Sequence, residues 1–115
     1  MEKEEVKQKL IDIFGAQIKF NRDFDDYISR LKDNMIVELI EWCSRCKERK
    51  EIGSQPKNKE YKHLYVFFRK IGSDVRAILI KEKNNDFIEL HLFDHKSYDN
   101  ERMNFGFKKS SYYGS

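Results

Sequence analysis

Residues 62–95 decide the fold, and they read KHLYVFFRKI, GS, DVRAILIKEK, NN and DFIELHLFDH in chain order. Each of the three longer runs is rich in β-branched and aromatic residues, and apolar side chains recur at alternate positions. That period is typical of a strand with one buried face. Gly72-Ser73 and Asn84-Asn85 separate the runs, and both pairs favour two-residue hairpin turns. The stretch therefore predicts a three-stranded antiparallel meander.

The lengths of the two turns also predict which side chains lie opposite each other. A two-residue first turn pairs Ile71 with Asp74 and sets Arg69 opposite Arg76, and the second turn sets Arg76 opposite Phe93. One face then collects apolar side chains, namely Leu64, Val66, Phe68, Val75, Ala77, Leu79, Ile88, Leu90 and Leu92. The other collects aromatic, ionisable and further apolar side chains, namely Tyr65, Phe67, Arg69, Asp74, Arg76, Ile78, Ile80, Phe87, Glu89, His91, Phe93 and His95. We expect helices to cover the first face and function to reside on the second.

The residues before the meander have helical periodicity. Apolar spacing predicts helices over 2–14, 24–31 and 36–50, with a short extended stretch at 16–20. The second and third helices form an antiparallel hairpin whose apolar stripe suits the apolar face of the sheet. Residues 97–104 are compatible with a further short helix. The order of segments predicts an α+β fold, an antiparallel sheet covered on one face by a helical hairpin.

The composition fits one globular domain. The chain has 115 residues, of which 14% are aromatic, and this suits a single hydrophobic core. Two cysteines cannot form a disulfide framework, and no apolar run approaches the roughly 20 residues that span a bilayer. The start, Met-Glu-Lys-Glu-Glu, lacks the features of a secretory signal. We expect a cytoplasmic domain over 1–115, with a helical extension at 1–15 and an aromatic, basic tail at 105–115.

The net charge of +3 conceals an uneven distribution of charge. Residues 45–76 contain ten basic and four acidic side chains. Clustered cations are typical of proteins that bind a polyanion, because each neutralised phosphate releases condensed counterions. A solvated helix end followed by a lysine-rich loop is the alternative interpretation.

Three stretches of sequence carry a resemblance to a known family. Residues 18–21 (IKFN) precede the helix at 24–31, residues 59–80 contain KEYKHLYVFFR and DVRAILI, and residues 88–98 read IELHLFDHKSY. In this order they resemble the RelE/ParE toxin superfamily over about residues 17–98, although Asp94 stands where that family usually has glycine. Members similar to RelE cut mRNA in the ribosomal decoding site, and members similar to ParE inhibit DNA gyrase. The resemblance implies a toxin whose partners are mRNA and a cognate antitoxin.

The resemblance also implies roles for particular residues. Arg76 matches the family's arginine on the middle strand, which steadies the scissile phosphate. His95 and Tyr98 match the C-terminal motif that supplies proton transfer and contact with the base.

RNA cleavage without a metal ion needs a base for the 2′-hydroxyl, an acid for the leaving oxygen and cations for the charged phosphorane. Histidine suits proton transfer because its ordinary pKa lies near neutrality. We therefore expect His95 to act as general acid or base, with His91 or Glu89 as its complement, and no cofactor or metal ion. The expected RNA-binding residues are Arg69, Tyr65, Lys57, Lys59, Lys62 and Lys96.

Three other interpretations stay open at this stage. The ionisable side chains of the second face can pair with one another, Asp74 and Glu89 with Arg69, Arg76 and His95, and form a surface without chemistry. Cys43 and Cys46 have the spacing of a zinc half-site, but both fall on the predicted buried stripe, which favours core cysteines. The fold also suits a gyrase inhibitor without nuclease activity, or a non-catalytic module that binds nucleic acid or protein.

Overall fold

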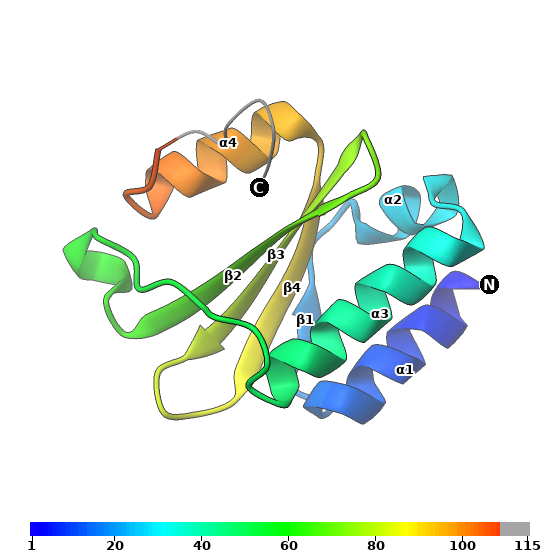
Figure 1. Ribbon diagram of the computed structural model, residues 1–115, viewed down its shortest axis with the longest axis horizontal. Coiled ribbons are helices and arrows are strands. Elements are labelled where there is room, and N and C mark those ends of the chain that lie inside the picture. Colours follow the sequence, from blue (N-terminus) through cyan, green and yellow to red (C-terminus); the bar gives the residue numbers. More distant parts are fainter. Residues whose placement is uncertain (109–115) are drawn as a thin grey trace.

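The computed structural model describes residues 1–108, and Figure 1 shows its helices and strands. The elements in chain order are α1 (Lys3–Phe14), β1 (Lys19–Phe20), α2 (Phe24–Arg30), α3 (Asp33–Lys47), the 3-10 helix η1 (Lys59–Tyr61), β2 (Leu64–Ile71), β3 (Val75–Glu82), β4 (Phe87–Phe93) and α4 (His95–Asn104). The predicted α+β class is confirmed. Of the tail expected at 105–115, residues 109–115 lie outside the described residues.

The four strands form one sheet in the order β1-β4-β3-β2. The meander is antiparallel as predicted, whereas β1 pairs parallel with β4, so the whole sheet is mixed. Asn21, directly after β1, fixes this edge. Its side-chain amide donates to the Leu92 carbonyl at 2.8 Å, and its side-chain oxygen accepts from the Leu92 N–H at 3.0 Å.

The outer edge of β2 is partly covered by the loop that precedes it. Ser54 forms a β-bridge with Val66, in which each backbone N–H donates to the other residue's carbonyl at 2.8 and 2.9 Å. Gly53 permits the close approach, because a Cβ there would lie 2.9 Å from Cζ of Phe67.

Helices α1 and α3 lie side by side on one face of the sheet (Figure 1). Their apolar stripes meet the sheet in the larger of two cores, which includes Val6, Leu10, Leu39 and Trp42 at 0–2% exposure. The N-terminal helix expected as an extension is therefore part of this core. No helix within residues 1–108 combines the length and apolar character needed to cross a membrane.

The predicted register between β2 and β3 is wrong by one residue. Ile71 pairs with Val75 rather than with Asp74, because the turn contains three residues instead of two. A shift of one residue moves every side chain of a strand to the opposite face relative to its neighbour. The residues assigned to the functional face of β2, Tyr65, Phe67 and Arg69, therefore lie on the side of α1 and α3.

The predicted register between β3 and β4 is confirmed over the part of the hairpin away from its turn, where Arg76 pairs with Phe93 and Ile78 with His91. A bulge between Ile80 and Lys81 shifts the pairing next to the turn by one residue. The bulge also reverses the predicted faces of two adjacent residues of β4. The Phe87 side chain joins the core under α1 and α3, and the Ile88 side chain packs on the other face.

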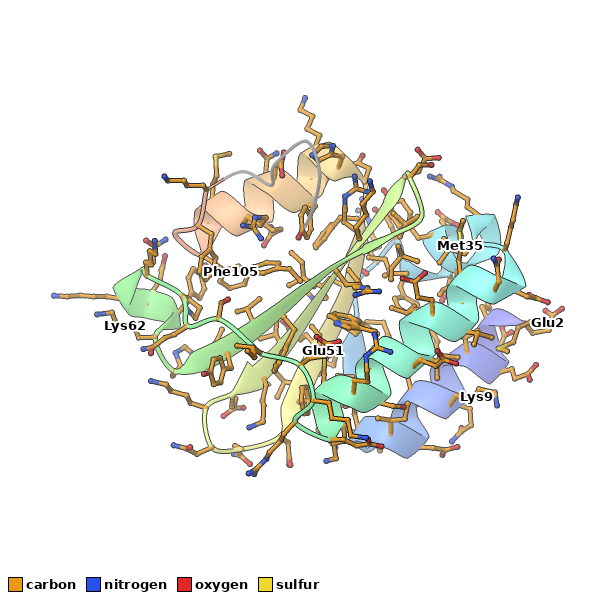
Figure 2. All side chains as sticks on the ribbon, in the orientation of Figure 1. Glu2, Lys9, Met35, Glu51, Lys62 and Phe105 are labelled. Atoms are coloured by element: carbon orange, nitrogen blue, oxygen red, sulfur yellow. The ribbon has the colours of Figure 1, made fainter. Side chains whose placement is uncertain are left out.

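The second face of the sheet is covered, which corrects the expectation of an open functional surface. Helix α4 lies across it (Figure 1) and forms a smaller core that includes Ile78, Ile80, Tyr98 and Phe105. Figure 2 places Phe105 between the end of α4 and the sheet. The helix begins at His95, two residues earlier than predicted, because the Asp94 carboxylate caps it by accepting from the Ser97 N–H at 2.7 Å.

Candidate functional site

A cleft of about 670 Å³ opens where the beginning of α4 meets the β2–β3 turn and the junction between α2 and α3. Its charged lining consists of Arg30 and Lys32 from the junction, Asp74 from the turn, and Asp94 and His95 from the beginning of α4. Its apolar and aromatic lining consists of Tyr27, Leu31, Met35, Ile71 and Val75. The cleft thus combines two cations, two carboxylates and a histidine with apolar side chains.

Gly72 lets the β2–β3 turn form one wall of this cleft. Its backbone has φ +66°, a left-handed conformation that side chains other than glycine's rarely adopt. A Cβ at this position would also lie 2.9 Å from Sδ of Met35. The turn can therefore pack directly against α3.

His95 lies at the mouth of the cleft with about half of its side chain exposed. Its Nε2 is 3.2 Å from Oδ2 of Asp99, one helical turn later. A carboxylate in this position orients the imidazole. The pair is therefore suited to proton transfer at the surface of the cleft.

The cations of the cleft come from the junction between α2 and α3. Arg30 and Lys32 are both exposed, and the Arg30 guanidinium lies 5.0 Å from the centre of the Tyr27 ring. Hydrogen bonds from Ser97 hold the pKa of Asp94 below its ordinary value, with smaller contributions from Lys96 and Arg30. Asp94 is therefore a charged cap beside these cations, and an anionic ligand would bind on the side of Arg30 and Lys32.

Arg76 pairs with Phe93, two residues before His95, but its side chain has little access to solvent. Its side chain is 5% exposed and donates to the carbonyls of Ser73 at 3.1 Å and Val75 at 3.3 Å. Its Nε is buried without a hydrogen-bond partner among the described residues. In this conformation Arg76 supports the β2–β3 turn and is not among the residues that line the cleft.

Tyr98 is fully buried between α4 and the sheet. Its hydroxyl has no hydrogen-bond partner in the described part of the chain. Burial raises the pKa of Tyr98, against the opposing effect of the Arg102 guanidinium. That guanidinium lies 4.5 Å from the centre of the Phe68 ring and 5.7 Å from that of Tyr98. Tyr98 is therefore part of the packing of α4 in this conformation and not a surface for a base.

His91 and Glu89 form a second, separate pair on the α4 side of the sheet. Nε2 of His91 is 3.6 Å from Oε2 of Glu89, and the two side chains are 23% and 38% exposed. Burial lowers the pKa of His91, against the raising effects of Glu89 and Glu101. His95 is four positions after His91, which corresponds to roughly 13 Å of extended chain. The structure therefore does not bring the two histidines together at one phosphate.

Arg69 and Tyr65 lie away from His95, on the opposite face of the sheet. The Arg69 guanidinium forms an ion pair with Glu38 of α3 at 2.9 Å. The alternative interpretation paired it with Asp74 or Glu89, and neither carboxylate forms that ion pair. The Tyr65 side chain is 37% exposed at the outer part of β2.

The lysines expected to bind RNA divide into two groups. Lys96 is exposed next to His95, whereas Lys57, Lys59 and Lys62 belong to the loop and 3-10 helix before β2. Lys57 donates its backbone N–H to the Phe105 carbonyl, at the far end of α4 from His95. Since α4 has ten residues, the two groups are about 15 Å apart along it.

The two cysteines are buried free thiols, as the apolar stripe predicted. Burial raises the pKa of Cys43 well above its ordinary value and that of Cys46 to about 12, so neither thiol is an activated nucleophile. Within residues 1–108, no three His, Cys, Asp or Glu side chains gather as metal ligands.

The sequence analysis did not identify Arg30, Lys32 or Asp99 as site residues. The i,i+4 spacing of His95 and Asp99 indicates a pair on one helix, but only if the helix begins at residue 95 and not at residue 97 as predicted. Arg30 and Lys32 enter the cleft through the packing of α2 and α3 against the β2–β3 turn, and no local pattern marks that contact.

A scan of protein-family models found no matching family, and searches of curated proteins and of solved structures found no significant match.

Proposed function

We propose that the chain is a RelE-like toxin that cuts mRNA in the ribosomal decoding site without a metal ion, and that a cognate antitoxin neutralises it in the cytoplasm. The observation that carries this proposal is the His95–Asp99 pair at the mouth of a cleft that also contains Arg30 and Lys32. The order of elements supports it as well. A short strand, a helical pair, a basic loop and a three-stranded meander precede His95, and this is the order on which the resemblance rests.

In such a reaction the 2′-oxygen of RNA attacks the adjacent phosphorus, and the bond from phosphorus to the 5′-oxygen breaks. The products are a 2′,3′-cyclic phosphate and a 5′-hydroxyl. His95 accepts the proton of the 2′-hydroxyl or donates one to the leaving 5′-oxygen, and water makes the opposite transfer. Asp99 holds the imidazole, while Arg30 and Lys32 stabilise the charge that develops on the phosphorane.

Cleavage of a reporter mRNA on translating ribosomes tests this function. Replacing His95 by Ala should lower the cleavage rate by about 10²–10⁴-fold, the usual contribution of a general acid or base. Replacing Asp99 by Asn should lower the rate less and shift its pH dependence, because Asp99 acts through His95. His63→Ala is the matched control, since His63 is exposed outside the cleft. A wild-type rate for the His95→Ala variant would exclude the proposed role.

The burial of Arg76 and Tyr98 favours a second candidate function. These are the positions to which the resemblance assigns contact with phosphate and base, and neither side chain is accessible. A protein of the same fold that inhibits DNA gyrase, or that binds nucleic acid or protein without cleavage, does not need them exposed. Inhibition of gyrase supercoiling by both wild type and the His95→Ala variant, with no RNA cleavage by either, would establish the gyrase inhibitor.

A further inference from the structure

A second groove, of about 840 Å³, lies at the other end of the sheet from the His95 cleft. It is bounded by the end of α3, the loop that follows α3, and the β3–β4 turn. The β2–β3 and β3–β4 turns stand at opposite ends of the meander (Figure 1). The eight residues of β3 correspond to roughly 25 Å between these ends. The groove is therefore spatially separate from the His95 cleft.

Four cations line this groove. Lys47 ends α3 and Arg49 follows two residues later, while Lys81 lies near the end of β3 and Lys83 directly follows that strand. None of the four forms an ion pair with a carboxylate among residues 1–108. Two carboxylates also line the groove, namely Glu51, which pairs with Arg45 at 2.9 Å, and Asp86. The four cations outnumber these carboxylates, and this excess of positive charge favours an anionic ligand.

Arg49 occupies a backbone conformation that usually belongs to glycine. The end of α3 forms a Schellman motif, in which the N–H of Arg49 donates to the Cys46 carbonyl and that of Lys50 to the Arg45 carbonyl. Arg49 has the left-handed φ of +64° that this motif requires. A non-glycine residue is strained there, and strain of this kind is frequent at functional positions. Arginine therefore occupies a position where glycine would adopt the same backbone conformation without strain.

Two further side chains give the groove an aromatic and apolar surface beside its charges. Tyr65 is 37% exposed in the wall of the groove, and Ile52 is 95% exposed at its rim. The Lys81 ammonium lies 5.8 Å from the centre of the Phe87 ring, which holds that lysine at the groove. An accessible aromatic ring next to a line of cations suits an unpaired nucleobase and its backbone phosphates.

We propose that this groove binds the backbone of single-stranded RNA without sequence preference, with Tyr65 stacking on one base. The site is distinct from the His95 cleft, and binding there requires no cleavage. If the chain is the ribonuclease proposed above, the groove holds the strand away from the scissile bond. The residues that carry the inference are Lys47, Arg49, Lys81, Lys83 and Tyr65.

Fluorescence anisotropy with a labelled 2′-O-methyl oligouridine tests the proposal, because this probe has no 2′-hydroxyl and cannot be cut. The affinity of the wild type should fall with rising salt concentration. Replacing Lys81 and Lys83 by Gln should weaken binding by roughly 25-fold at 0.1 M salt and reduce the slope of log K against log salt by about 1.4, if each lysine contacts one phosphate. Tyr65→Phe should retain affinity and Tyr65→Ala should lose roughly tenfold.

The matched control removes the same charge from a distant surface. Lys3 and Lys9 are exposed on α1, and Figure 2 shows Lys9 on the outer side of that helix. The double replacement of both by Gln should leave the affinity and the salt slope almost unchanged. An equal loss in this control and in the Lys81/Lys83 variant would overturn the proposal, since it would show only the effect of net charge.

Two further outcomes bear on the same inference. Arg49→Gly should weaken RNA binding and at the same time raise the midpoint of thermal unfolding, a combination that damage to the fold cannot produce. Binding of a polyglutamate peptide, with no binding of the oligonucleotide, would assign the groove to an acidic protein and reject RNA. Because the probe is not cleaved, failure here leaves the test of His95 untouched, and a cleavage-deficient His95→Ala variant should bind the probe normally.

Discussion

The two faces of the sheet differ in the chemistry of what is buried against them. Under α1 and α3, the buried cluster consists of aliphatic and aromatic side chains together with the two thiols. Under α4, the smaller cluster of Ile78, Ile80 and Tyr98 lies beside the buried guanidinium of Arg76. Two polar atoms near it, Nε of Arg76 and the Tyr98 hydroxyl, have no hydrogen-bond partner in the described chain.

This difference distinguishes the face that stabilises the fold mainly through apolar burial from the face that also buries polar groups in its smaller core. Apolar burial stabilises a fold by about 25 cal/mol for each Å² removed from water, whereas a buried polar atom without a partner costs about 1–3 kcal/mol. The face under α1 and α3 gains the first over its larger core, and the atom of the second kind that the described sheet residues place on this side, Nε of Arg69, belongs to a guanidinium that is paired with Glu38. The face under α4 accepts unsatisfied polar atoms, and such exceptions in a folded protein call for a reason beyond packing.

The largest effect is expected from the apolar face. Leu39 is fully buried in α3, so replacing it by Ala should lower the free energy of unfolding by about 2–5 kcal/mol, through lost burial and the cavity left behind. Urea unfolding followed by circular dichroism measures the change. Val37→Ala is the control, since Val37 is 42% exposed on the same helix and should change stability by less than about 0.5 kcal/mol. Equal effects at both positions would contradict the assignment of this core.

A smaller effect of opposite sign is expected under α4. Replacing Tyr98 by Phe removes a buried hydroxyl without a partner and keeps the ring, so the free energy of unfolding should rise by about 1 kcal/mol. The same urea titration measures it, with Tyr27→Phe, a half-buried position, as the reference. A loss of stability in the Tyr98→Phe variant would show that the hydroxyl is bonded and would remove the contrast between the two faces.

The smallest effect concerns pH. Burial lowers the pKa of His91 in the folded chain below the ordinary 6.5, so the folded chain binds this proton less readily than the unfolded chain. The stability that His91 contributes is therefore complete above pH 6.5 and is lost as the pH falls through the lower folded pKa. Replacing His91 by Gln should flatten the pH dependence of the free energy of unfolding below about pH 6.5. An unchanged slope in the His91 variant would exclude this contribution.

The helices and strands could be predicted from the sequence because their signals are local. The period of the apolar residues identified the three helices before the sheet and the three strands of the meander, and the element order of the α+β fold follows from them. The boundary of α4 was missed by two residues because Asp94 was not recognised as its cap. Pairing of the two-residue β1 with β4 depends on long-range contacts that no local pattern contains.

Side-chain placement on β2 could not be predicted from the same signals. Gly72-Ser73 suits a two-residue turn, but Asp74 joins the turn as well, and a single extra residue reverses the two faces of β2. The alternation in β2 gave no warning, because Tyr65 and Phe67 on one face are as large and apolar as Leu64 and Val66 on the other. Between β3 and β4 the register near the turn also differs by one residue from the predicted register. The bulge opposite Ile80 and Lys81 offsets this difference, so Ile78 pairs with His91 as predicted.

The candidate site was predictable only in part for the same reason. His95 follows from its position after the third strand, and the structure places it at an accessible cleft. Arg30 and Lys32 join it from more than 60 residues earlier in the chain, through the packing of α2 and α3 beside the β2–β3 turn. Whether a guanidinium such as that of Arg76 is exposed depends on α4 as well as on its own strand, so the alternation of residues in β3 cannot decide it.

The bridge between Ser54 and Val66 has a consequence for how copies of the chain meet. An uncovered border strand offers its backbone N–H and carbonyl groups to any neighbouring chain and so promotes aggregation. Here the bridge occupies Val66, near the beginning of β2, and the opposite border, β1, is only two residues long. The bridge and the shortness of β1 therefore reduce the length of border with which an incoming strand can pair, and this limits intermolecular pairing at high concentration.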